Sequence, residues 1–513
     1  MSRLSNPISD QSDDQSTSSD LLLPDKQTHG TVQTEVQTSY AGGNNEKPRL
    51  LTVSFSCVVI VQSWLMYGLS VGYISPVLSD LEGSGGNSSA PLDKLVYQDL
   101  FTVLPAISGL VSVVIAGWVV DKIGRKPSLL VCSIAHAIGW LLVVLTLLTE
   151  GTMFRLLLFV GRFSAGIGMG FASLCAPLYI AELTPRRIRG FFGTMTQLSL
   201  SVGVFIGQLV GTYITYYWLA VIILMVTCVF TVLAISLKET PRWLMTQKRN
   251  HEAREILVWL RGKNYNVDKE LQEVAEQLEL ENKTKLNFTE TVQEFKKKSV
   301  YYPVIIAAIL AVFQQCTGVV GVISNAEDIF KQAKIKSPGL LSSIALGGTQ
   351  IVAQIFGTIL VDVLGRRVLL ISSAVITSLS LTVMGTYEYL NSEPYCNPST
   401  GSGCKDHLYP LAIAAMACFI AGFSIGLGGI PWIVTAEIIP LKVRGVGVGI
   451  VSCVNWVLII IYAGLFRNYE DAVHPWGAFW SFALITFCGA IYIATFVPET
   501  KGKSLEEIER SFL

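Results

Sequence analysis

The residues of this chain best suited to reversible chemistry are acids and bases that recur at the same spacing in its two halves. DKIGRK (121–126) returns as DVLGRR (362–367), and AELTPRRIRG (181–190) returns as AEIIPLKVRG (436–445). The acids and bases at matching positions are Asp121, Arg125, Glu182, Arg189, Asp362, Arg366, Glu437 and Arg444. Ion pairs among such groups are individually weak and jointly bistable, which suits a gate rather than catalysis. Two repeats in the same order also indicate a duplicated membrane unit.

The two DxxGR loops reverse the chain between apolar runs, and Gly124 and Gly365 supply the backbone freedom that tight loops need. Arg125 and Arg366 can then reach Glu182 and Glu437 at the ends of neighbouring helices. We predict pairs that close one mouth of a cavity and separate when that mouth opens. A simpler interpretation, in which basic loops only fix membrane orientation, explains the arginines but not the acids.

Amides and tryptophans inside apolar segments form a second group. An amide both donates and accepts hydrogen bonds, and an aromatic ring offers an apolar face for stacking, so such a group suits a cavity that binds a polar molecule. The group comprises Gln197, Gln208, Gln314, Gln315, Gln350, Gln354, Trp432, Asn455 and Trp456. A single amide more often bonds a neighbouring helix. The Gln314-Gln315 pair and a glycine-rich, breakable helix before Trp432 favour a cavity.

Membrane helices must position these residues. The chain has 513 residues, of which 51% are hydrophobic and 15% charged, whereas soluble domains carry roughly 25% charged residues. The charges collect between apolar runs of about 20 residues, the length that spans a bilayer. We predict an all-α membrane protein with twelve transmembrane helices in two six-helix bundles.

The predicted spans lie near 50–78, 98–120, 128–148, 154–180, 190–211, 217–237, 301–325, 340–361, 368–390, 409–435, 446–466 and 475–497. The domains are then a disordered tail (1–48), a bundle (49–237), a helical linker (238–300), a second bundle (301–497) and a short tail (498–513). Lysine and arginine concentrate in the loops on the linker side, so we expect both termini to be cytoplasmic.

Three residues of the connecting loops can carry modifications. Asn87 begins the glycosylation sequon Asn-Ser-Ser in a loop that this topology places outside. Cys396 and Cys404 share a polar loop, and the sequence leaves open whether they form a disulfide. The other eight cysteines lie in apolar runs without metal-ligand spacing, and a net charge of zero does not favour nucleic acid.

Several motifs in order resemble the sugar porter family of the major facilitator superfamily. They are the two DxxGR loops, Gly161-Arg162, PLYIAELTPRRIRG, ETPRW (239–243), Ile430-Pro431-Trp432 and PETKG (498–502). The resemblance covers all twelve spans and is greatest to the glucose and trehalose facilitators of insects. It implies two six-helix bundles that rock about a central site, with Glu239 and Glu499 in the charge network. Arg162, an ionisable residue within a span, is a functional candidate on physical grounds as well.

The resemblance also assigns the sugar contacts. Gln197, Gln314, Gln315, Trp432 and Trp456 match the family's positions, and Gln350 replaces the usual Asn with a longer amide. Polar residues of the family fall here on Val320, Ala311, Ser424 and Ile459. The pocket is therefore expected to be less polar than that of a typical glucose facilitator, which leaves a hexose, a disaccharide such as trehalose or another polyol open.

The proton-coupled relatives share an Asp on span 1, where this chain has Ser70, and no Asp, Glu or His lies between Leu50 and Leu78. We expect a facilitative uniporter in the plasma membrane, working as a monomer without cofactor or metal, with an endosomal pool left open. A proton-coupled symporter and a non-transporting sugar sensor are the alternatives; the short C-terminal tail favours a carrier over a sensor. No sequence motif favours an enzyme.

Overall fold

The computed structural model describes residues 50–83, 95–262, 265–284, 287–332, 337–392, 408–503, 507–508 and 512. Every regular element in these ranges is a helix. The predicted glycosylation site Asn87 and the cysteines Cys396 and Cys404 lie outside them.

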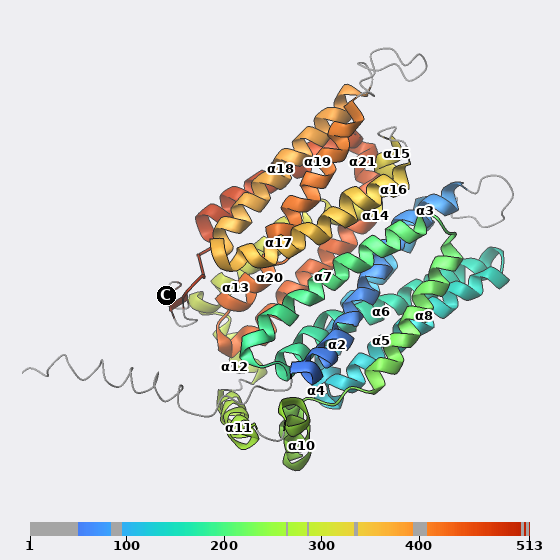
Figure 1. The fold of residues 1–513 in the computed structure, drawn as a ribbon. Helices are drawn as coiled ribbons and strands as arrows, with labels where there is room; N and C mark the ends of the chain where they lie inside the picture. The colour runs from blue at the N-terminus through green and yellow to red at the C-terminus, as the bar shows by residue number, and fades with distance from the viewer. Residues whose placement is uncertain are drawn as a thin grey trace, which may run out of the picture. The chain divides into compact units, whose positions relative to one another are not determined.

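The first half consists of long, nearly uninterrupted helices (Figure 1). They are α2 (Leu50–Gly72), α3 (Ile74–Gly83), α4 (Leu95–Ile123), α5 (Arg125–Leu145) with the short η1 (Thr146–Leu148), α6 (Gly151–Leu183), α7 (Arg186–Gly211) and α8 (Tyr216–Ile235). Glycines let these helices approach closely: a Cβ on Gly203 of α7 would lie 2.5 Å from the carbonyl oxygen of Leu65 in α2. A Cβ on Gly139 of α5 would lie 2.6 Å from the carbonyl oxygen of Gly161 in α6.

Four short helices follow and lie at one end of the spans (Figure 1). They are α9 (Pro241–Thr246), α10 (Asn250–Arg261), α11 (Val267–Thr284) and α12 (Phe288–Glu294). Arg261 ties α10 to its neighbours, because its Nε and Nη2 donate to Glu270 of α11 and its Nη1 donates to the carbonyl of Leu183 at the end of α6. We call this end of the molecule the linker face and the other end the opposite face.

The second half is built from interrupted helices. They are α13 (Lys298–Gln315), α14 (Val319–Ser324), α15 (Ala326–Gln332), α16 (Pro338–Ser342), η2 (Ser343–Gly348), α17 (Thr349–Leu364), α18 (Arg366–Leu390), α19 (Tyr409–Gly422), η4 (Phe423–Leu427), α20 (Ile430–Ile438), η5 (Leu441–Val443) and α21 (Arg444–Phe496). The elements η2 and η4 are π-helices. Gly318, with φ of 76°, separates α13 from α14, a conformation that favours glycine.

The described residues contain eleven helices long and apolar enough to span a membrane, and the last, α21, has 53 residues. It contains two spans, because His474 has non-helical angles (φ 63°, ψ 155°) directly before Pro475. The predicted twelve-helix fold is therefore confirmed. Large apolar side chains on the outer surfaces of the helices, such as Val232 (68% exposed) and Leu379 (62% exposed), are suited to lipid rather than water.

The two halves meet along three lines of contact. α21 packs on α4, α7 packs on η2 and α17, and α15 packs on α3 near the opposite face. Trp456 of α21 is central to the first line: it is buried, stacks on Tyr67 of α2 with ring centroids 6.2 Å apart, and packs on Gly109 of α4. A Cβ on Gly109 would lie 2.5 Å from the Trp456 ring, so glycine is required for this contact.

Candidate functional site

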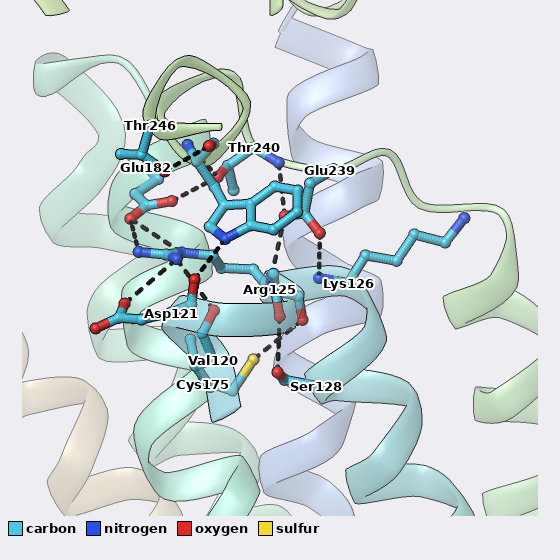
Figure 2. A network of polar contacts seen from close by, with 12 residues as sticks. Val120, Asp121, Arg125, Lys126, Ser128, Cys175, Glu182, Glu239, Thr240 and Thr246 are labelled. Atoms are coloured by element: carbon cyan, nitrogen blue, oxygen red, sulfur yellow. Dashed lines mark hydrogen bonds and ion pairs between the residues drawn. The ribbon is translucent and has the colours of Figure 1, made fainter. Parts of the chain in front are cut away.

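The first DxxGR loop is the centre of a polar network on the linker face (Figure 2). Arg125 donates from Nε and Nη2 to Glu182 Oε1, at 3.2 and 2.8 Å, and its Nη1 lies 3.5 Å from Asp121. Glu239 accepts the backbone N–H groups of Arg125 and Lys126, at 3.0 and 3.1 Å. A carboxylate at the first turn of α5 is favoured by the free N–H groups and by the helix dipole.

The second loop repeats this arrangement with other residues. Arg366 pairs with Glu437 at 3.4 Å, and Glu499 accepts the backbone N–H groups of Arg366 and Arg367, both at 3.0 Å. Gly365 has φ of 90°, and a Cβ there would lie 2.8 Å from Glu499 Oε2. Gly124 has the same role toward Glu239 in the first half (φ 101°, 2.4 Å). The glycines therefore leave room for the carboxylates on the helix ends.

The two equivalent carboxylates have opposite electrostatic environments. Burial raises the pKa of Glu239, and the backbone N–H groups of Thr240, Arg125 and Lys126 oppose this effect without cancelling it. Burial also acts to raise the pKa of Glu499, but here the opposing hydrogen bonds prevail. Four backbone N–H groups, including those of Thr500 and Lys501, hold the pKa of Glu499 below its ordinary value. The ionised form is thus favoured more in the second half.

The structure places most of the predicted charge network together, half by half. Arg125 with Glu182 and Glu239, and Arg366 with Glu437 and Glu499, are each in contact within one half. Two arginines donate to backbone carbonyls just before their helices: Arg189 to Thr184 at 3.4 Å and Arg444 to Ile439 at 3.2 Å. The side chain of Asp362 lies outside the described part of the structure.

Arg162, the functional candidate within a span, has contacts of a different kind from those of the loop networks. It is fully buried in α6, where Nη1 donates to the carbonyl of Ser70 at 3.1 Å and the guanidinium lies 4.7 Å from the Phe101 ring and 5.6 Å from the Tyr73 ring. Its Nε and Nη2 have no hydrogen-bond partner among the described residues. Rings and a helix carbonyl therefore stabilise this cation in the core of the first half.

The central amides meet at the break in the second half. Gln314 donates from Nε2 to the carbonyls of Leu427 and Gly428, at 2.7 and 3.0 Å, and its Oε1 accepts from Asn455 at 3.1 Å. One side chain thus joins α13, the π-helix η4 and α21. Both polar atoms of the Gln314 side chain are hydrogen-bonded within the protein, so in this state the side chain connects helices.

The other predicted sugar contacts differ in their exposure. Gln315 and Gln350 are buried, and within the part of the chain that the structure describes the Oε1 atom of Gln315 has no hydrogen-bond partner. Gln197 is half-buried on α7. Trp432 is 37% exposed on α20, directly after the interrupted turn, whereas Trp456 is 5% exposed between the two halves. Gln315 therefore keeps a free acceptor, and Trp432 keeps a free ring surface.

Comparison with known proteins agrees with this geometry. Residues 55–512 match the family described as sugar (and other) transporter. The chain belongs to that family. It is 33% identical to the facilitated trehalose transporter of Bombyx mori over 443 residues, which cover 86% of this chain and 83% of that protein. It is 31% identical to the solute carrier family 2, facilitated glucose transporter member 8 of Bos taurus over 493 residues, or 94% and 98% of the two chains.

Solved structures show the same fold. The inward-open xylose transporter XylE of E. coli superposes with a TM-score of 0.71 at 21% identity, over 90% of this chain and 99% of that chain. Another structure of that protein is described as a major facilitator superfamily proton:xylose symporter. The resemblance to sugar porters is therefore confirmed, and membership of a transporter family identifies the chain as a multi-pass membrane transporter rather than an enzyme.

One cluster of this sugar transporter family member was not singled out from the sequence. Arg467 of α21 donates from Nη2 to Asp328 of α15 at 2.9 Å, from Nε to Asn325 at 3.0 Å and from Nη1 to Gln98 of α4. Gln98 belongs to the first half and the other three residues to the second. This Arg467 cluster therefore joins the halves at the opposite face.

Two more hydrogen bonds cross between the halves near the same face. The backbone N–H of Glu327 donates to Ser75 Oγ at 3.1 Å, and Gln208 Nε2 donates to the carbonyl of Ile323 at 3.2 Å. Together with the Arg467 cluster, they join the two halves at the opposite face. The signal in the sequence was an arginine at the end of an apolar run, which also fits membrane-surface anchoring, so its partners could not be chosen without the fold.

Proposed function

We propose that this transporter carries a hexose or a trehalose-like sugar down its gradient by alternating access. The observation that carries the proposal is the amide junction at Gln314, where an interrupted helix inside the membrane exposes the carbonyls of Leu427 and Gly428 beside Asn455. Non-helical backbone at this depth is tolerated only within protein or beside a polar cavity. The substrates named for the Bombyx and Bos proteins support the sugar class.

Sugar contacts on this proposal come from both halves. Gln315 offers a buried acceptor that no other described residue bonds, and Trp432 offers an accessible ring. Gln197 and Gln350 add amides from α7 and α17. Gln314 and Asn455 exchange their mutual hydrogen bond for sugar hydroxyls as the site fills. Trp456 does not bind the sugar in this proposal; its ring packs on Gly109 and holds the two halves together beside the site.

Gating on this proposal uses the two faces differently. The Arg467 cluster joins the two halves at the opposite face, and on this proposal it holds that face closed. The pairs Arg125–Glu182 and Arg366–Glu437 each connect helix ends within one half at the linker face. On this proposal they keep those helix ends in place when the two halves approach each other and that face closes. Asp121 pairs with Arg125 in the same network, while Arg189 and Arg444 bond the carbonyls of Thr184 and Ile439 beside it. Basic residues in the linker-face loops support a cytoplasmic location for that face.

Facilitated diffusion is favoured over proton coupling by the surroundings of Arg162. The position facing it on α2 is Ser70, whose backbone carbonyl accepts the Arg162 bond, and no acid or histidine occurs from Leu50 to Leu78. A proton-coupled symporter is the second candidate, supported by the fold shared with the proton:xylose symporter. On the proposal, the termini are cytoplasmic, Asn87 is glycosylated and the monomer works in the plasma membrane.

Uptake of labelled sugars into proteoliposomes tests the proposal. A panel of hexoses, pentoses, trehalose and polyols is measured with and without an imposed pH gradient, and with a proton uncoupler. We expect saturable uptake of a hexose or of trehalose that is equal under all three conditions, and a loss for Gln315→Ala at unchanged protein content. Accumulation driven by the pH gradient would establish the symporter, and binding without flux would establish a sensor.

A further inference from the structure

The π-helix η4 in the tenth span places two of its backbone groups out of their ordinary helical bonds. In an α-helix, the N–H of Leu427 would donate to the carbonyl of Phe423. Here Gly428 takes that carbonyl instead, at 2.7 Å. In a π-turn the N–H of Leu427 lies opposite the carbonyl of Gly422, five residues earlier, so these two groups close the widened turn.

Ser373 of α18 contacts both of these groups. Its Oγ accepts from the N–H of Leu427 at 2.9 Å and donates to the carbonyl of Gly422 at 2.6 Å. One hydroxyl thus bonds both ends of the π-turn, and Ser373 itself is only 1% exposed. The close approach depends on Gly426, where a Cβ would lie 2.5 Å from the Ser373 Cβ.

Other hydroxyls of the same helix behave differently. Those of Ser380, Thr382 and Thr386 donate to carbonyls one turn earlier in α18, which is the usual bond of Ser and Thr inside a helix. Ser378 bonds a carbonyl of the twelfth span, at Ala483, with one hydrogen bond. Ser373 combines a donated and an accepted bond to a single turn of another helix.

The turn held by Ser373 leads directly into the proposed sugar site. The carbonyl of Leu427, on the residue whose N–H Ser373 accepts, receives Gln314 Nε2 at 2.7 Å, and Gly428 receives it at 3.0 Å. Gln314 in turn accepts from Asn455. The hydrogen bonds therefore run without interruption from α18 through η4 to α13 and α21.

We propose that Ser373 is a positioning residue for sugar binding: its hydroxyl holds the π-turn at Phe423–Leu427 in the form that seats Gln314. Ser373 touches no sugar and acts through Gln314. The inference rests on the proposed function for its effect on sugar affinity, but the contact between Ser373 and the turn stands on the geometry alone. Loss of the hydroxyl removes both of its hydrogen bonds to the turn, at Leu427 N–H and at the Gly422 carbonyl, and lets the carbonyls of Leu427 and Gly428 move away from Gln314.

Two measurements on the purified full-length protein test the inference. The first is hydrogen–deuterium exchange of the peptide that contains residues 423–428. Ser373→Ala should speed its exchange about three- to tenfold, the effect of losing one buried hydrogen bond. Ser378→Ala, the matched control, removes a buried hydroxyl from the same helix and should leave that peptide unchanged. Equal exchange in the two variants would overturn the inference.

The second measurement is sugar uptake in a double-mutant cycle with Gln314→Ala. Ser373→Ala should raise KM about three- to tenfold, with the maximal rate per transporter retained, and should add nothing in the Gln314→Ala background. A multiplicative effect in both backgrounds would show that Ser373 does not act through Gln314. If Ser373→Ala does not accumulate, Gly426→Ala displaces the same hydroxyl and should give the same exchange and KM changes.

Failure of the proposed function gives a separate result. If neither Gln314→Ala nor Ser373→Ala changes KM while exchange of 423–428 still rises, the sugar site lies elsewhere. In that case the contact between Ser373 and the turn stands and its role in sugar binding falls. If Gln314→Ala raises KM and Ser373→Ala does not, the positioning role alone is wrong.

Discussion

The two halves of this transporter repeat the same motifs but are built for different work. In the first half, glycines such as Gly68 and Gly203 bring α2 and α7 into backbone contact, and the helices run nearly unbroken. In the second half, the seventh, eighth and tenth spans are each interrupted, and polar side chains such as Ser373 and Gln314 satisfy the freed backbone. A duplicated chain can thus keep one half as a rigid frame and use the other to respond to a ligand.

The largest expected effect is on the close helix contacts of the first half. Gly203→Val places a side chain where a Cβ alone would lie 2.5 Å from a backbone oxygen. We expect a loss of about 3 kcal/mol or more in stability, because backbone cannot move aside cheaply. Gly193→Ala, on the same helix with open space at its Cβ, is the control. Equal thermal stability of the two variants in detergent would contradict the rigid-frame account.

The next effect is on the closed opposite face. Arg467→Gln removes the ion pair with Asp328 and the bonds to Asn325 and Gln98. Charge-assisted hydrogen bonds contribute about 1.5–3 kcal/mol, so the population open at that face should rise roughly ten- to hundredfold. Labelling of a cysteine placed at Ser75 by a membrane-impermeant reagent measures this opening. Unchanged labelling would remove Arg467 from the gate.

A smaller effect is expected for the linker-face pair of the second half. Arg366 and Glu437 are 18% and 25% exposed, so the pair contributes about 1 kcal/mol. Arg366→Glu and Glu437→Arg should each slow transport, and the double exchange should restore part of the rate. The same exchange at Glu437 and Arg444 is the comparison, since Arg444 bonds the carbonyl of Ile439. If the Glu437/Arg444 exchange restores transport and the Arg366/Glu437 exchange does not, the functional partner of Glu437 is Arg444.

The smallest effect distinguishes the equivalent carboxylates by pH. The pKa of Glu499 is lowered, so its contribution to stability is present above the ordinary pKa of 4.5 and is lost as pH falls through the folded-state pKa. The pKa of Glu239 is raised, so its protonation as pH falls relieves a cost. Glu499→Gln should therefore destabilise the protein more than Glu239→Gln at pH 7. The difference between the variants should narrow as pH falls through the raised pKa of Glu239, and the loss caused by Glu499→Gln should itself shrink only below pH 4.5. Melting temperatures of the two variants that differ by the same amount at every pH would contradict this prediction.

Much of the linker face was predictable from the sequence, because repeated motifs pair residues by position. The partners of Arg125 and Arg366 and the role of the loop glycines follow from the repeat. The environment of Arg162 did not follow, since its contacts are a carbonyl and aromatic rings rather than an acid. An ionisable residue in a span shows that it needs a partner, but not which one.

The interior was predictable only in part. The glycine-rich stretch before Trp432 indicated a broken helix, and the Gln314-Gln315 pair indicated a polar cavity beside it. The π-turn itself and the serine that holds it could not be predicted, because serines are common in membrane helices and usually bond their own turn. Ser373 differs from Ser380 only through the helix that lies beside it.

Alternating access is the central claim, and distances across both faces test it most directly. Spin labels at exposed positions report each face: Tyr213 and Tyr409 at the opposite face, and Phe191 and Val446 at the linker face. Adding the transported sugar, or introducing Arg467→Gln, should lengthen the first distance in part of the population and shorten the second in the same part. Two distances that stay fixed, or lengthen together, would contradict alternating access in this protein.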